Sequence, residues 1–244
     1  MSGHSKWSTI KRKKEKTDGA RAKVFTKISR EIVVAVKEGG GVPENNAKLR
    51  DLISKAKANN IPNDNIDRLI KKAAGDSEKD NYESIVYEGY GPSGVAVMVD
   101  ALTDNRNRTA GDLRHYFDKY GGNLGQNGCV SFLFERKGLI LVENPDEEID
   151  EDKFMEDLME TPAGDYVFEG DVIEVTTNPD DLQAVRDALE KKGYHFESAE
   201  VEYIPVTQTK LENPEDLEKM EKLLDMLEDN DDVQNVWHSC ADFN

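Results

Sequence analysis

The stretch YVFEGDVIEVTTNPDDLQAVRDALEKKGYHFESAEVEYI, residues 166–204, decides the fold class because its hydrophobic period changes twice within one short segment. Two strand-like runs, residues 166–169 and 172–176, flank a Gly-Asp turn; a helical period follows over residues 179–192, and a strand over residues 195–204. Just upstream, residues 139–142 predict a strand and residues 150–159 a helix. The full order, strand-helix-strand-strand-helix-strand, is that of a ferredoxin-like domain.

The segments on either side of this unit predict a second α/β domain, which the unit interrupts. Strands at residues 84–90 and 95–101, a helix at 110–120 and a strand at 129–134 come before it. A helix at residues 214–228 and a strand at 233–239 come after it and supply the second helix that the first part lacks. We therefore predict a discontinuous α/β domain, residues 81–135 plus 206–244, with a ferredoxin-like domain, residues 136–205, inserted into it.

The first 80 residues predict a helical module. Apolar residues recur at helical spacing over residues 17–37, 45–59 and 62–75, and the first helix ends at three consecutive glycines, residues 39–41. Residues 1–16 show no apolar period and predict a basic arm. The fold class is therefore α+β and multidomain: an N-terminal three-helix module within residues 1–80, followed by the two α/β domains.

Charge is distributed unevenly along the 244 residues, which carry a net charge of −18. Residues 1–80 hold 19 Lys and Arg against 11 Asp and Glu, a net charge of +8, whereas residues 81–244 hold 13 against 39, a net charge of −26. A basic module on an acidic body is typical of a protein that meets an anionic partner with one end. Lys and Arg bind phosphates by releasing counterions. The candidate nucleic-acid-binding residues are Lys6, Trp7, Lys11, Arg12, Lys13, Lys14, Lys16, Arg21, Lys23, Lys27 and Arg30.

Trp7 has two interpretations that the sequence does not separate. Its indole can stack on an unpaired base, or it can pack the arm onto the helices. A possible second site, formed by Asn105, Arg106, Asn107 and Arg108, lies at the start of a predicted helix, where amide and guanidinium groups could donate to phosphates or base edges. The glycine-rich residues 121–128 follow that helix, and turn chemistry alone is the better explanation for them.

Nothing in the sequence indicates catalysis or a bound metal or cofactor. The four histidines are scattered, no phosphate-binding loop or nucleophile elbow occurs, and Gly89-x-Gly91-x-x-Gly94 lies between two strands instead of preceding a helix. The two cysteines are too few and too far apart for a disulfide framework. The apolar runs are far shorter than the ~20 residues of a membrane-spanning helix. We therefore expect a cytoplasmic protein that is not an enzyme, with no metal, no cofactor and no membrane association.

Four motifs, in order along the chain, resemble the YebC/PmpR family. They are Gly3-His4-Ser5-Lys6-Trp7-x-x-Ile10-Lys11, Val24-Phe25-Thr26-Lys27-x-x-Arg30-Glu31-Ile32, Ile61-Pro62-x-x-Asn65-Ile66 and Thr103-Asp104-Asn105-x-Asn107-Arg108-Thr109. The resemblance covers essentially the whole chain and implies three domains, no cofactor and no known catalytic residues. Family members are labelled transcriptional regulators that bind DNA. Related proteins, including the mitochondrial translational activator of cytochrome oxidase subunit I, act in translation.

Together these observations predict a nucleic-acid-binding regulatory factor of gene expression that acts through its basic N-terminal module. Its target stays open between promoter DNA and the rRNA or tRNA of the ribosome. The module offers mostly lysines, whereas sequence-specific readout of duplex DNA usually needs Arg, Asn or Gln at base edges, often in a symmetric dimer. It shows no evident dimer seam, so a monomer is favoured. A basic arm on an acidic body suits structured RNA equally. The alternative function is a protein-interaction scaffold that uses the ferredoxin-like domains.

Overall fold

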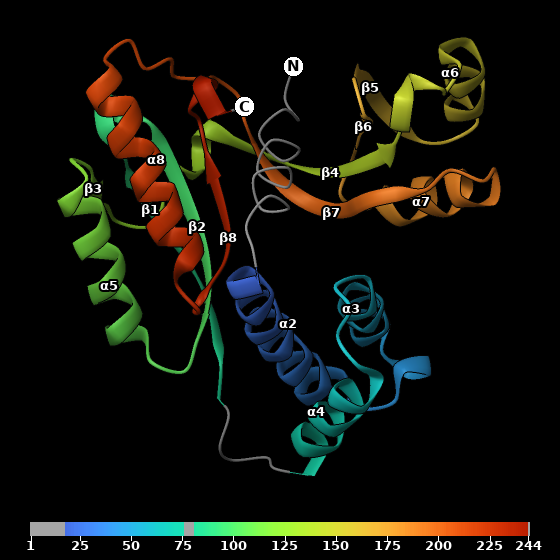
Figure 1. The fold of residues 1–244 in the computed structure, drawn as a ribbon, viewed down its shortest axis with the longest axis horizontal. Helices are drawn as coiled ribbons and strands as arrows, with labels where there is room; N and C mark the ends of the chain where they lie inside the picture. Colours follow the sequence, from blue (N-terminus) through green and yellow to red (C-terminus); the bar gives the residue numbers. More distant parts are fainter. Residues whose placement is uncertain (1–17, 76–80, 244) are drawn as a thin grey trace. The chain divides into compact units, whose positions relative to one another are not determined.

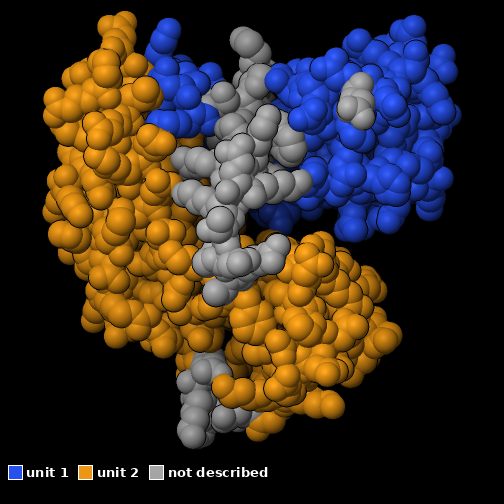
Figure 2. All heavy atoms as spheres, in the orientation of Figure 1, with its two compact units in different colours: residues 1–12, 132–210, 239–244 blue, residues 13–131, 211–238 orange. Residues whose placement is uncertain are grey.

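The structure is a computed structural model that describes residues 18–75 and 81–243, except for the side chains of residues 18–22 and of Asp146. The chain divides into two compact units (Figure 2). Of the described residues, unit 1 contains 132–210 and 239–243, and unit 2 contains 18–75, 81–131 and 211–238. The predicted basic arm, residues 1–16, lies outside the described residues. Within the described ranges, no helix combines the length and the apolar character needed to cross a bilayer.

The N-terminal part of unit 2 is the expected helical module. It consists of α2 (Asp18–Gly39), a short 3-10 helix η1 (Pro43–Asn45), α3 (Ala47–Ala58) and α4 (Asn63–Gly75). Ile32, Leu49 and Ile66 are almost fully buried and bring one residue from each helix into a common core. Asn46 caps α3, because its side-chain oxygen accepts a hydrogen bond from the backbone N–H of Leu49.

The remainder of unit 2 is a four-stranded antiparallel sheet with two helices (Figure 1). Its elements are β1 (Glu83–Tyr90), η2 (Pro92–Gly94), β2 (Ala96–Thr103), α5 (Arg106–Lys119), β3 (Asn123–Leu124), α8 (Pro214–Asp229) and β8 (Val233–His238). The strand order is β3-β1-β2-β8, so the last strand of the chain pairs with the second. Helices α5 and α8 contact each other and bury Phe117 and Met220 completely.

Unit 1 contains the inserted ferredoxin-like domain. The elements of this domain are β4 (Phe134–Glu143), η4 (Pro145–Glu147), α6 (Glu151–Met159), β5 (Ala163–Glu169), β6 (Val172–Thr177), α7 (Leu182–Lys191) and β7 (Phe196–Pro205). Unit 1 also contains the short 3-10 helix η5 (Ala241–Phe243), near the end of the chain. The sheet order β5-β6-β4-β7 places the first and third strands of the unit at its centre. Phe154 and Leu158 of α6 and Val185 and Leu189 of α7 pack on Ile140, Val142, Ile173 and Val175 of the two central strands.

One predicted strand is wrong, and one helix begins earlier than expected. Residues 129–134 do not form a strand, because Ser131–Leu133 is a 3-10 helix, η3, and β4 starts only at Phe134. The fourth place in the first sheet belongs to the two-residue strand β3. Helix α5 starts at Arg106 instead of residue 110, because Asn105 caps it. The domain boundaries at residues 80, 135 and 205 stay a prediction, since compactness groups the helical module with the interrupted α/β domain.

Candidate nucleic-acid interface

Most of the predicted nucleic-acid-binding residues precede the described part of the chain. Lys6, Trp7, Lys11, Arg12, Lys13, Lys14 and Lys16 lie outside the described residues. Arg21 belongs to α2, but its side chain is not described. The structure therefore places only Lys23, Lys27 and Arg30 from this set, together with the four residues of the second predicted site.

Three basic side chains of α2, those of Lys23, Lys27 and Arg30, bind acidic and carbonyl groups around the C-terminal end of α8. Lys23 Nζ lies 2.8 Å from Asp229 Oδ1. Lys27 Nζ donates a hydrogen bond of 2.8 Å to the backbone oxygen of Glu228, in the last turn of α8, where the helix dipole attracts a cation. Lys23 and Lys27, which the sequence assigns to a phosphate partner, thus connect the helical module to the α/β domain.

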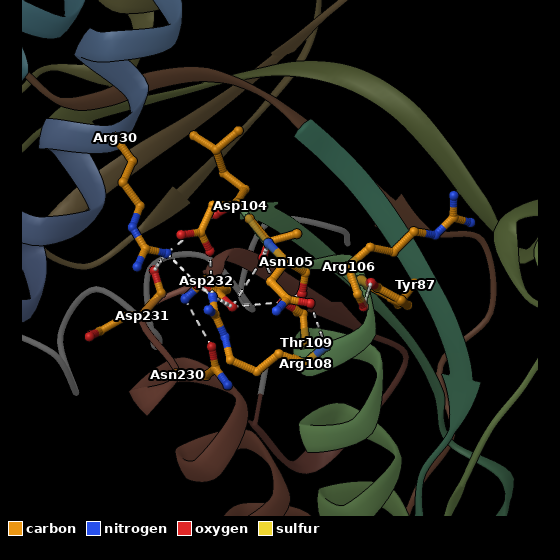
Figure 3. Close-up of polar contacts among 12 residues, drawn as sticks. Arg30, Tyr87, Asp104, Asn105, Arg106, Arg108, Thr109, Asn230, Asp231 and Asp232 are labelled. Carbon is orange, nitrogen blue, oxygen red and sulfur yellow. Dashed lines mark hydrogen bonds and ion pairs between the residues drawn. The ribbon is translucent and has the colours of Figure 1, made fainter. Parts of the chain in front are cut away.

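Arg30 makes a largely buried contact with Asp232 (Figure 3). Its Nη1 lies 2.5 Å from Asp232 Oδ1 and donates a 2.8 Å hydrogen bond to the backbone oxygen of Asp231. Its guanidinium also lies 5.4 Å from the ring centroid of Tyr82. The side chain of Arg30 is only 16% exposed and that of Asp232 only 5%, so the ion pair is largely shielded from water.

Asp232 is bound from its other side by the start of α5 and the end of β2. Arg108 Nη2 lies 2.8 Å from Asp232 Oδ2, and the Thr109 hydroxyl donates to the same oxygen over 2.6 Å. Thr103 Oγ1 lies 3.3 Å from Asp232 Oδ2 and accepts a hydrogen bond from the backbone N–H of Asn105. One carboxylate therefore joins α2, β2, α5 and the turn between α8 and β8. We call Arg30, Thr103, Arg108, Thr109 and Asp232 the Asp232 cluster.

The buried carboxylate of Asp232 stays charged because its neighbours stabilise the charge. Burial by itself would raise the pKa of Asp232, but the hydrogen bonds from Thr109, Arg108 and Arg30 outweigh it and lower that pKa below the ordinary value for aspartate. Asp232 is therefore ionised at neutral pH, and its negative charge is compensated by two guanidinium groups. If α2 moved away, Arg30 would leave Asp232, and a buried charge would lose part of its compensation. Because that loss is costly, the cluster fixes the position of α2.

The second predicted site separates into two structural and two outward-facing residues. Asn105 Oδ1 accepts the backbone N–H of Arg108 as the cap of α5, and Arg108 also bonds Asp104 Oδ1 at 2.8 Å. Arg106 and Asn107 are exposed, and within the described ranges the side chain of neither forms a hydrogen bond or ion pair. In Figure 3 the guanidinium of Arg106 points away from the Asp232 cluster. Arg106 and Asn107 are thus the members of this site whose side chains are available to a ligand.

The glycine-rich loop is held by a buried glutamate that the sequence analysis missed. Glu88 of β1 accepts three backbone hydrogen bonds of 2.7–2.8 Å, from Gly128, Val130 and Ser131. Although burial opposes ionisation, these bonds lower the pKa of Glu88. They also draw the backbone N–H groups away from strand pairing, which explains the missing strand at residues 129–134. A Cβ atom at Gly122 would come within 2.3 Å of the Tyr90 carbonyl oxygen, so packing requires glycine there.

A second buried carboxylate, Glu174, lies in the ferredoxin-like domain. It sits on β6 between Leu141 of β4 and Val167 of β5 and is 3% exposed. Its Oε1 has no hydrogen-bond partner among the described residues. Burial, with a smaller contribution from Glu169, raises the pKa of Glu174 to about 7.

The described residues do not bring together a metal site. Within residues 18–75 and 81–243, no group of three His, Cys, Asp or Glu side chains is placed to hold a metal ion. Cys129 and Cys240 are both free thiols.

The sequence contains no local signal for the Asp232 cluster. Asp232 lies 202 residues from Arg30 and 124 from Arg108, and it follows Asp231 in an acidic run that resembles ordinary solvated surface. Only the position of Asn105 and Arg108 at a helix start was visible in the sequence. The role of Arg30 in this cluster therefore emerges from tertiary structure alone.

The fold defines a multidomain α+β protein in which a basic helical module is fixed to an antiparallel α/β domain that carries an inserted ferredoxin-like domain. Family models match nearly the whole chain in two parts. The TACO1/YebC protein N-terminal domain matches residues 5–76, and the TACO1/YebC second and third domain matches residues 82–240. The chain belongs to the TACO1/YebC family.

Curated relatives and a solved structure agree with this assignment. A protein of Acetivibrio thermocellus is 57% identical over 98% of each chain, and one of Clostridium novyi is 57% identical over 98% of this chain and 97% of its own. Both are named probable transcriptional regulatory proteins, which supports a regulatory role. The crystal structure of a conserved hypothetical protein from Aquifex aeolicus has a TM-score of 0.83 and 46% identity, with 92% of each chain covered.

Proposed function

We propose that the protein is a non-enzymatic regulator of gene expression that works in the cytoplasm and binds nucleic acid through its N-terminal module. The observation that carries the proposal is the separation of charge, +8 over residues 1–80 against −26 over residues 81–244. A phosphate-rich partner is attracted by the first part and repelled by the second. The relatives are named probable transcriptional regulatory proteins, and a role in transcription would make promoter DNA the target. The charge pattern suits rRNA or tRNA on the ribosome equally.

The contacts divide between two kinds of residue in this proposal. The basic arm, with Lys6, Lys11, Arg12, Lys13, Lys14 and Lys16, supplies phosphate contacts, and Trp7 supplies a stacking surface. Lys23, Lys27 and Arg30 act indirectly, because they bond Asp229, Glu228 and Asp232 of the α/β domain. The buried Arg30–Asp232 pair contributes most to the orientation of the helical module. Arg106 and Asn107 offer a second point of contact on the α/β domain.

The test compares two variants of the full chain with the same loss of charge. The arm variant replaces Lys11, Arg12, Lys13 and Lys14 by Gln. The control replaces four lysines of the acidic body by Gln: Lys191, Lys210, Lys219 and Lys222. Binding is measured by gel shift on duplex DNA and by co-sedimentation with ribosomes over a salt series. For duplex DNA, we expect the arm variant to bind more weakly on every sequence, with a salt slope lower by about 3–4, at roughly 0.9 per phosphate contact.

Two results contradict the proposal. One is wild-type protein that binds neither duplex DNA nor ribosomes, or binds them without salt dependence. The other is an arm variant whose affinity equals that of the control variant. The stronger of the two wild-type interactions identifies which nucleic acid is the target.

A further inference from the structure

A groove of about 690 Å³ lies on the helical module between α3 and α4. One face of α3 lines it with Arg50, Ile53, Ser54 and Lys57, at helical spacing, and one face of α4 lines it with Asn63, Ile66, Asp67, Ile70 and Lys71. Arg50, Lys57 and Lys71 are exposed, whereas Ile53, Ile66 and Ile70 are buried or half-buried. The groove therefore combines an aliphatic floor with cationic side chains at the surface.

The cations of this groove differ from the other basic side chains of the module. Within the described residues, the side chains of Arg50, Lys57 and Lys71 form no hydrogen bond and no ion pair. Every other described basic side chain between residues 23 and 75 has a partner. Lys48 pairs with Glu38 at 3.0 Å, Lys55 with Glu31 at 3.8 Å, and Arg68 bonds the Asp64 carbonyl oxygen, in addition to the α2 contacts above. The three cations without a partner are thus the three that line the groove.

We propose that this groove binds the sugar-phosphate backbone of single-stranded RNA, an inference that rests on the proposed function and adds a site distinct from the basic arm and from Arg106 and Asn107. Arg50, Lys57 and Lys71 bind consecutive phosphates, and the ribose packs on the aliphatic floor. Asp67 decides between RNA and DNA. A carboxylate only accepts hydrogen bonds, and the ribose 2′-hydroxyl is the backbone donor that DNA lacks. Asp67 forms no ion pair among the described residues and is available for this contact.

The first experiment removes the three cations of the groove from the full chain. The groove variant is Arg50→Gln/Lys57→Gln/Lys71→Gln, and the control is Lys48→Gln/Arg68→Gln/Lys72→Gln, which removes equal charge from the same two helices. The probe is a fluorescein-labelled unstructured RNA longer than the roughly 4–16 nucleotides that one single-strand-binding domain covers. Each phosphate contact contributes about 0.7 to the salt slope of a single strand, so the loss of three contacts lowers the slope by about 2. At 0.15 M salt we therefore expect the groove variant to bind roughly 50-fold more weakly than wild type.

The second experiment tests the choice of RNA with DNA of the same sequence and the variant Asp67→Ala. Wild-type protein should prefer RNA, and the variant should lose that preference, since it lacks the acceptor for the 2′-hydroxyl. Thermal unfolding followed by circular dichroism checks that all variants are folded, which we expect because the substituted side chains are exposed.

The outcomes separate this inference from the proposed function. If wild-type protein binds duplex DNA or ribosomes but not the unstructured RNA, the proposed function stands and the groove inference is overturned. If it binds none of these nucleic acids, both fail. If the arm variant weakens binding while the groove variant behaves like its control, the proposed function stands and the groove inference is overturned. If the groove variant loses affinity but wild-type protein binds DNA as tightly as RNA, the assignment to RNA is overturned.

Discussion

Asp232→Asn is the substitution that most directly tests whether the Asp232 cluster holds the helical module in place. The change keeps the shape of the side chain but removes the charge that Arg30 and Arg108 share. A hydrogen bond to a charged group contributes about 1.5–3 kcal/mol, and breaking a buried pair costs about 3–5 kcal/mol. Arg108 is 45% exposed, so its share is small, and we expect a loss of about 3 kcal/mol in the free energy of unfolding.

The assay is urea unfolding followed by tryptophan fluorescence in a Trp7→Phe background. The chain has two tryptophans, so Trp237 of β8 then becomes the only one, and it lies in the same unit as the cluster. With a slope of about 2 kcal/mol per molar urea, the midpoint should fall by about 1–2 M. Asp229→Asn is the matched control, because Asp229 pairs with Lys23 but its side chain is 60% exposed. That control should change stability by less than about 1 kcal/mol.

The pH dependence gives an independent check on the same substitution. Because the pKa of Asp232 is lowered in the folded protein, its charge stabilises the fold above the unfolded pKa near 4, and this contribution disappears as the pH falls through the lower folded pKa. The difference between wild type and Asp232→Asn should therefore be full at pH 7 and shrink below pH 4. Equal costs for Asp232→Asn and Asp229→Asn, or a difference that does not change with pH, would refute this account.

Three further substitutions test three other buried polar residues, Glu88, Glu174 and Asn46. Glu88→Gln should cost about 2 kcal/mol, because a neutral side chain replaces the charged acceptor of three backbone bonds; hydrogen exchange should accelerate at residues 128–131 and stay unchanged in unit 1 if the reasoning holds. Glu174→Gln should stabilise the protein by about 2 kcal/mol at pH 8 and not at pH 4. The reason is that the raised pKa makes the wild type lose stability between pH 4.5 and about 7; thermal unfolding at both pH values measures the change, and equal effects would count against it. Asn46→Ala should cost about 2–3 kcal/mol, since it removes the α3 cap and the bonds from its amide to the Ala35 and Gly40 carbonyls; a loss below about 0.5 kcal/mol in urea unfolding would contradict this.

The sequence alone determined most of the helices and strands, their order along the chain and the distribution of charge. The ferredoxin-like plan was predictable because the hydrophobic period of residues 139–204 is a local property, and the three helices of the module follow from the same kind of pattern. The prediction of a strand at residues 129–134 was wrong because a distant contact, and not a local property, decides the structure there. Glu88, some 40 residues earlier in the chain, holds that backbone in a loop, and no local propensity reveals such a contact.

Tertiary structure decided which basic residues contact acidic or carbonyl groups elsewhere in the described part of the chain. The sequence assigns Lys23, Lys27 and Arg30 to a phosphate surface, but their partners at residues 228–232 lie about 200 positions away, and pairing at that separation leaves no local pattern. The groove on the module arises in the same way, because it forms only when one face of α3 meets one face of α4. The amino-acid composition fixes how many charged side chains the protein has. The fold decides which of them lie beside groups of opposite charge and which stay accessible to a solvent ion or a phosphate.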